Sequence, residues 1–162
     1  MDQSQELFVK MIMLSWEAQN SRTTKLFNTL TDDQFLLEVS PGRNRGIYLL
    51  GHLIAVNDSL AVTLGLGERL FSQYEDIFLE KPDKSGMEMP DIDTLKQNWN
   101  QGTQQLKDYF KKMTAGDWFL KHTTISEADF AKEPHRNKLN VLITRINHEA
   151  YHQGQLTLLQ KK

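Results

Sequence analysis

Four long amphipathic segments constrain the fold of this chain more than any other feature. Apolar residues recur at three- and four-residue steps within residues 3–30, 44–64, from Pro90-Asp91 to about Met113, and from 137–140 almost to the end. This spacing is typical of helices that bury one face. No segment shows the alternation of a strand followed by a hairpin turn. We therefore expect a single all-α domain over residues 1–162, built as a four-helix bundle.

The two links before the third segment predict how the helices are connected. The first begins Thr31-Asp32-Asp33-Gln34, a capping-box pattern for one short helical turn, and breaks at Ser40-Pro41-Gly42. The second, residues 65–90, contains LFSQYEDIFL, which is expected to form a short helix of its own. A link of this length can cross the whole bundle, so the third helix is expected to run parallel to the second.

Composition and charge exclude several classes of protein. The net charge of -2 gives no electrostatic case for binding nucleic acid or an anionic membrane. No apolar run reaches the roughly 18 to 20 residues of a membrane span, and MDQSQELF does not resemble a secretory signal. The chain has no cysteine, which excludes disulfides, thiolate ligands and a cysteine nucleophile. We expect a cytoplasmic protein.

Three histidines are the candidate metal ligands. His148 and His152, in the stretch HEAYH, lie four residues apart on one helix face and can meet a single ion. His52 lies at the centre of the apolar stripe of the second helix, between Leu49 and Val56. Any one of them alone is most simply a hydrogen-bonded core histidine. Three buried imidazoles each need a polar partner, and a shared divalent cation satisfies all three.

The pattern H-E-x-x-H also occurs in zinc peptidases, where the glutamate acts as base. Those enzymes need a third ligand downstream, and none of the ten residues after His152 is a histidine or a carboxylate. There is also no strand to hold an extended peptide. We therefore interpret HEAYH as a metal pair on a bundle helix. His122 and His135, in the polar link before the fourth helix, are expected to be surface residues.

Three neighbours of the histidine pair have weaker assignments. Glu149 can act as a base, orient a ligand, or be a solvated charge. Gln155 lies seven residues after His148 on the same face and is expected to line the pocket. Gly154 is expected to permit close helix packing.

The segments YLLGHLIAVND and INHEAYHQGQLTLL resemble the DinB-like superfamily of metalloenzymes, also called the DinB/YfiT family. The matching motif is one histidine in the second helix, H-x-x-x-H in the fourth, and the Gly-Gln-Leu that follows. These correspond to His52, His148, His152 and Gly154-Gln155-Leu156. The resemblance implies an up-down-down-up four-helix bundle, a three-histidine metal site at one end of its core, and a homodimer. Characterised relatives include thiol-dependent S-transferases, a mycothiol-dependent maleylpyruvate isomerase and metal-dependent hydrolase-like proteins.

Three functions follow from an open three-histidine site. Three neutral imidazoles leave a fourth position free, as in catalytic zinc sites, and such an ion activates water or a thiol. The ion is expected to be zinc or nickel, with iron or manganese as further candidates. The first hypothesis is a thiol-dependent S-transferase acting on small electrophiles, with a low-molecular-weight thiol as cosubstrate. The alternatives are a hydrolase that uses metal-bound hydroxide, and a non-catalytic metal-binding dimeric bundle or sensor.

Overall fold

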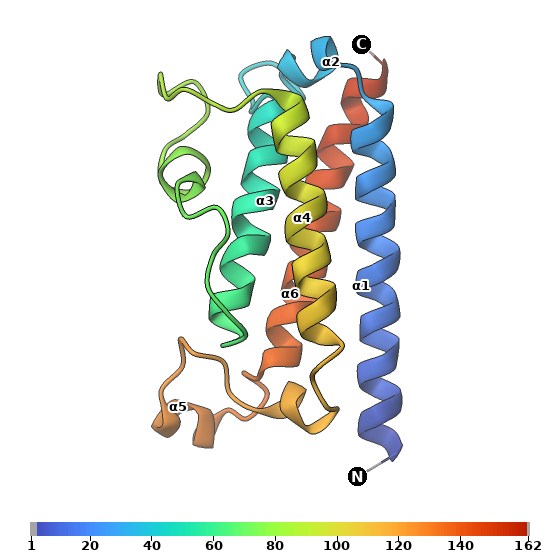
Figure 1. The fold of residues 1–162 in the computed structure, drawn as a ribbon, viewed down its shortest axis with the longest axis vertical. Coiled ribbons are helices and arrows are strands. Elements are labelled where there is room, and N and C mark those ends of the chain that lie inside the picture. Colours follow the sequence, from blue (N-terminus) through green and yellow to red (C-terminus); the bar gives the residue numbers. More distant parts are fainter. Residues whose placement is uncertain (1–2, 162) are drawn as a thin grey trace.

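The computed structural model describes residues 3–161. All regular secondary structure in this range is helical, and it contains no strand. The four long helices are α1 (Gln3–Thr29), α3 (Gly46–Thr63), α4 (Ile92–Phe110) and α6 (Lys138–Leu156). In Figure 1, α1 rises from the N-terminus, α3 and α4 both descend, and α6 rises again to the C-terminus. The predicted four-helix bundle with up-down-down-up order and parallel second and third long helices is confirmed.

Capping side chains explain where the short helix α2 and the long helix α4 begin. The short helix α2 (Asp32–Leu36) starts with the predicted capping box: the Thr31 hydroxyl accepts from the Gln34 amide, and the Gln34 side chain accepts from the Thr31 amide. At the start of α4, the Asp91 carboxylate accepts from the backbone amide of Thr94. Both side chains satisfy amides that a helix start leaves without an intrahelical partner.

The crossover, residues 64–91, returns the chain from the end of α3 to the start of α4. Its regular part is a short π-helical turn, η1 (Asp76–Glu80), which covers only the end of the helix predicted in LFSQYEDIFL. The crossover is tied to α3 by charge. The Asp83 carboxylate accepts from the Arg45 backbone amide and from the Arg45 guanidinium, each at 2.7 Å. These bonds hold η1 against the outer side of α3 (Figure 1).

The link from α4 to α6 contains elements that the sequence interpretation did not predict. It holds a 3-10 turn, η2 (Gly116–Phe119), and a short helix, α5 (Glu127–Lys132). The Ser126 hydroxyl caps α5 by accepting from the Asp129 amide. A Ser-x-x-Asp pattern of this kind is a recognisable helix start, so the sequence carried a signal for α5. A further 3-10 turn, η3 (Thr157–Lys161), follows α6.

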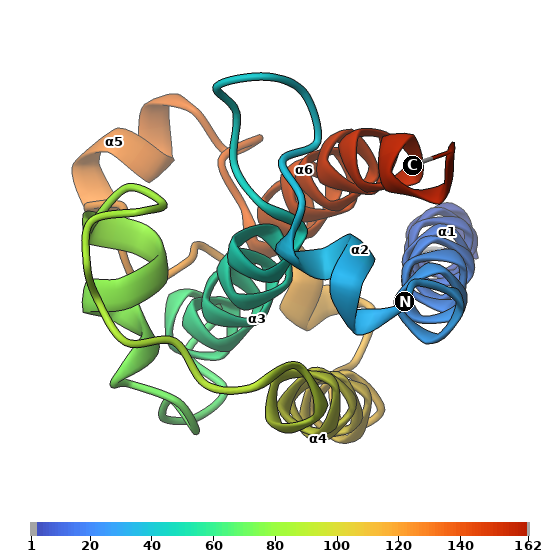
Figure 2. The same ribbon diagram turned by 90° about the horizontal axis from the view of Figure 1, so that it is seen from above.

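Helix α3 lies between α4, α6 and the crossover, and α1 lies diagonally across the bundle from it (Figure 2). Among residues 3–161, α3 is the one helix long and apolar enough to cross a membrane, but 78% of that window is buried inside the bundle. This is the behaviour expected of the core helix of a globular domain. Helix α1 packs mainly on α6 and more loosely on α4.

Candidate metal centre

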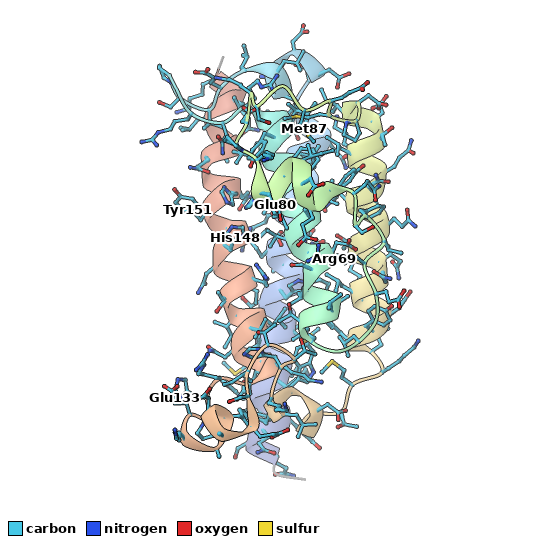
Figure 3. All side chains as sticks on the ribbon, turned by 90° about the vertical axis from the view of Figure 1, so that its left-hand side faces the viewer. Arg69, Glu80, Met87, Glu133, His148 and Tyr151 are labelled. Atoms are coloured by element: carbon cyan, nitrogen blue, oxygen red, sulfur yellow. The ribbon has the colours of Figure 1, made fainter. Side chains whose placement is uncertain are left out.

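The three predicted histidines meet at the seam between α3 and α6. His52 comes from α3, and His148 and His152 come from successive turns of the antiparallel α6. The Nε2 atom of His148 lies 3.3 Å from Nε2 of His52 and 3.1 Å from Nε2 of His152. One ligand atom from each ring lies within 4.8 Å of the others. Figure 3 shows His148 and Tyr151 of α6 on the face that also carries Arg69, Glu80 and Met87 of the crossover.

In His52 and His152, the second ring nitrogen, Nδ1, forms a hydrogen bond to an acceptor oxygen. The Nδ1 atom of His52 lies 2.8 Å from the backbone carbonyl oxygen of Phe78, and Nδ1 of His152 lies 2.8 Å from Oε1 of Gln155. Because both oxygens only accept, each Nδ1 carries the proton and each Nε2 presents a lone pair. Histidine ligands of metals are commonly oriented by a hydrogen bond of this kind.

A cation fits this arrangement better than hydrogen bonds among the rings. The lone pairs of His52 and His152 are both directed at Nε2 of His148, which has at most one hydrogen to share between them. The Nδ1 atom of His148 is buried and has no hydrogen-bond partner in the described part of the chain. One divalent ion bound by the three Nε2 atoms satisfies all three lone pairs together. The residues present therefore suit a three-histidine metal site.

The surroundings keep these rings neutral. Burial is the main cause that lowers the pKa of each ring. For His148, repulsion from the two neighbouring rings and from Arg145 adds to burial, and together these causes bring its pKa to about 4. Metal binding requires neutral imidazole, so the folded chain presents its ligands in the competent state at neutral pH.

The crossover supplies a part of the site that sequence reasoning missed. Phe78 in η1 is fully buried against α3, and its ring occupies the space next to Gly51. A Cβ atom at Gly51 would lie 2.2 Å from the Phe78 ring, so only glycine allows this approach. The Tyr48 hydroxyl donates to the backbone carbonyl of Lys81 at 2.8 Å and fixes the end of η1. Gly51 next to His52, inside the first half of a helix, was the available signal.

Glu149 lies apart from the ring nitrogens and is not a solvated charge. Its side chain is 2% exposed, and its hydrogen-bond partner is Thr23 of α1. Burial raises the pKa of the Glu149 carboxyl to about 7, although the Thr23 bond acts in the opposite direction. Its Oε1 atom is buried with no partner among residues 3–161.

The remaining predicted residues have mixed outcomes. Gln155 contacts the site as the acceptor for His152, and its amide donates to the Tyr151 hydroxyl at 3.3 Å. Gly154 does not serve close packing: a Cβ atom there would meet nothing within 4 Å. His135 is exposed and His122 bonds to Thr124, so neither joins the cluster.

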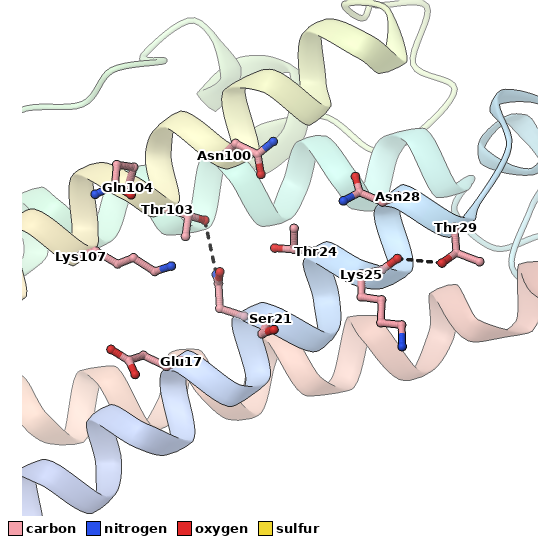
Figure 4. A pocket seen from close by; sticks show the side chains of 11 residues that line it. Glu17, Ser21, Thr24, Lys25, Asn28, Thr29, Asn100, Thr103, Gln104 and Lys107 are labelled. Atoms are coloured by element: carbon pink, nitrogen blue, oxygen red, sulfur yellow. Dashed lines mark hydrogen bonds between the residues drawn. The ribbon is translucent and has the colours of Figure 1, made fainter.

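A separate polar cavity of about 580 Å³ lies between α1 and α4, where the two helices pack loosely. Amide, hydroxyl and charged side chains line it, as Figure 4 shows. At its floor the Asn20 amide donates to the Thr103 hydroxyl over 3.4 Å. No histidine lines this cavity, so it is distinct from the seam between α3 and α6.

Comparison with known families agrees with the fold and the cluster. The profile of the DinB superfamily matches residues 15–156, a span that includes all three histidines. The chain is therefore a member of the DinB superfamily. A search of the curated proteins found no match. Family membership and the three-histidine cluster together fit a metal-binding protein.

Replacing Gly51 by alanine tests the role of the crossover. Alanine normally stabilises a helix interior by about 1 kcal/mol relative to glycine. Here we expect the opposite, a loss of about 1–3 kcal/mol in the free energy of unfolding, because the Phe78 ring must move. We also expect about 10- to 100-fold weaker metal binding, because the Phe78 carbonyl leaves His52. The measurements are chemical denaturation and metal titration.

The matched control is Gly102→Ala, in the middle of α4. A Cβ atom at Gly102 would meet the Phe71 ring at 3.7 Å, which is an ordinary contact. This variant should gain stability and keep its metal affinity. Equal changes in the free energy of unfolding and in metal affinity in Gly51→Ala and Gly102→Ala would contradict the proposed role of Gly51.

A second prediction concerns the buried carboxyl of Glu149. Because its folded pKa of about 7 lies above its ordinary value of 4.5, the folded state binds this proton more tightly than the unfolded state. The wild type therefore loses stability relative to Glu149→Gln as pH rises from about 4.5 through 7. We expect the variant to be more stable at pH 8, by on the order of 3 kcal/mol at most, and nearly equal at pH 4.5.

Denaturation of both proteins in the presence of a chelator measures this difference without a contribution from metal. The control is Glu88→Gln, which makes the same change on an exposed side chain. A stability difference for Glu149→Gln that does not grow with pH would show that the carboxyl is not desolvated.

Proposed function

We propose that this chain is a metal-dependent enzyme in which His52, His148 and His152 hold one divalent ion. The observation that carries the proposal is the convergence of three Nε2 atoms while acceptors hold the Nδ1 atoms of His52 and His152. Zinc and nickel suit three imidazoles best, and iron and manganese are further candidates. Three ligands leave room for a small molecule on the ion, which is the arrangement of a catalytic rather than a structural site.

The leading reaction is transfer of a low-molecular-weight thiol to a small electrophile. A bound divalent ion supplies the Lewis acidity that lowers the pKa of a thiol. The three histidines are neutral ligands and add no negative charge, so they preserve this acidity. The chain contains no cysteine, so the thiol must be a cosubstrate. The nucleophile then needs no general base from the protein.

Hydrolysis is the second candidate reaction, with Glu149 as the base. A carboxyl with a pKa of about 7 is well matched to proton transfer near neutral pH. Its hydrogen bond to Thr23 turns the carboxyl towards α1, however, and we rank hydrolysis second for that reason. A metal-stabilised bundle or sensor without catalysis is the third candidate.

The partners and location that we propose are a small-molecule substrate, a second copy of the chain, and the cytoplasm. We propose no nucleic-acid or membrane partner. Support for a homodimer comes from α1, where Leu7, Met11 and Leu14 are each more than half exposed. Their spacing places them on one helix face, and a contiguous exposed apolar face commonly marks a protein interface.

The homodimer proposal predicts the effect of charge on that face. Met11→Glu combined with Leu14→Glu should convert a dimer into a folded monomer, as measured by light scattering coupled to gel filtration. Leu158→Glu, at an exposed apolar residue after α6, is the control and should leave the mass unchanged. A wild type that is monomeric at high concentration would contradict the proposal.

The metal site predicts the metal content of untagged protein. Wild type should bind about one equivalent of a divalent ion, and His52→Ala with His148→Ala should bind none by elemental analysis. The control pair His122→Ala and His135→Ala removes two histidines outside the cluster and should retain the metal. Because the pKa of all three rings is lowered, binding should persist below pH 6.5 and weaken only as the pH falls towards these lowered values, about 4 for His148. Equal metal in wild type and the first double variant would refute the assignment.

The order of the three functions is tested by turnover of a model electrophile. Zinc-loaded wild type should convert it faster when a small thiol is added, and His52→Ala should abolish that stimulation. Turnover that is independent of thiol and lost in Glu149→Gln would establish hydrolysis instead. If no metal-dependent turnover occurs, and chelation changes only melting temperature or oligomeric state, the non-catalytic function is correct.

A further inference from the structure

Arg145 is a cation next to the histidine cluster that the functions above do not use. It precedes His148 by three residues and His152 by seven on α6. At about 100° per residue, these steps place its Cα within about 60° of both histidines around the helix axis. Its charge acts on the rings, because it contributes to the lowered pKa of both His52 and His148.

Arg145 has no counter-ion in the described part of the chain. It forms none of the hydrogen bonds or ion pairs found among residues 3–161, although its side chain is partly buried. Burial lowers the pKa of the Arg145 guanidinium, and no neighbouring carboxylate raises it. A partly buried cation without a partner costs free energy that a bound anion would offset.

The acid one turn further along α6 does not neutralise it. Glu149 follows Arg145 by four residues, a spacing at which opposite charges usually pair. The Glu149 carboxyl instead bonds to Thr23 of α1, and Arg145 does not contribute to its pKa. Arg69 of the crossover, a cation labelled on this face in Figure 3, is already paired with Glu75.

The charges of the site favour an anionic ligand. The described ligand cluster contains three histidines and no carboxylate. A divalent ion held by neutral imidazoles therefore keeps its full charge, and the guanidinium adds another positive charge beside it. We propose that Arg145 binds the carboxylate of the small molecule that meets the metal ion, so that this centre selects anionic ligands over neutral and cationic ones. This inference rests on the proposed metal site and adds the class of ligand.

The test uses cobalt-loaded protein and three small thiols. The probes are 3-mercaptopropionate, 3-mercapto-1-propanol and cysteamine, whose ends are anionic, neutral and cationic. Titration of the sulfur-to-cobalt charge-transfer absorption gives the Kd of each. The quantity compared is the Kd ratio of neutral to anionic thiol, which should fall about tenfold in Arg145→Met. Thiol acidity and any chelation by the carboxylate affect wild type and variant alike, so they cancel.

The controls separate this inference from the metal site itself. Arg136→Met removes an exposed cation elsewhere and should keep the wild-type ratio. Arg145→Gln should lose the preference for the anionic thiol as Arg145→Met does. If the methionine variant does not fold, the glutamine variant tests the role of Arg145 in its place. An unchanged ratio in the Arg145 variants, or an equal loss in Arg136→Met, would overturn the inference.

A wild type that takes up no cobalt would refute the metal site, and the anion site is then tested alone. Propionate should raise the melting temperature of metal-free wild type but not that of Arg145→Met. An equal response of the two proteins would overturn the role of Arg145.

Discussion

The structure depends on one electrostatic problem at the seam between α3 and α6, where three imidazole nitrogens approach one another. Two of the rings present a lone pair to the third, and hydrogen bonds alone cannot satisfy both. Burial lowers the pKa of all three rings, so protonation does not relieve the conflict at neutral pH. A divalent cation does relieve it, and the same features that make the metal-free seam unfavourable make it a good metal site.

The order of the helices explains how the crossover comes to contact His52. The crossover must travel back along α3 because α3 and α4 run parallel, and this path brings η1 over His52. Gly51 lets the Phe78 ring approach the helix, and the Arg45–Asp83 ion pair anchors the following segment. The carbonyl of Phe78 then selects the tautomer of His52. The long link thus positions His52, a candidate metal ligand.

The sequence predicted those features that depend on local spacing. The helical period located the four long helices, and the four-residue step from His148 to His152 placed both rings on one face. Gly51 signalled a close approach to the helix beside His52, but the bond from His52 to the Phe78 carbonyl could not be predicted, because a backbone carbonyl has no signature in the side-chain sequence. The direction of the Glu149 side chain also escaped prediction, since it depends on the packing of α1 against α6. Gly154 was misinterpreted because glycine spacing alone does not show which helix face has a neighbour.

We propose that three neutral histidines bind one metal ion through Nε2 while acceptors hold the Nδ1 protons of His52 and His152. Nitrogen-15 NMR of the imidazole side chains, recorded before and after addition of zinc, tests this most directly. We expect Nδ1 of His52 and His152 to be protonated in both states, and zinc to shift the Nε2 resonances of all three rings. Zinc that shifts the Nδ1 resonances of His52 and His152 instead, or leaves the three Nε2 resonances unchanged, would refute binding through Nε2.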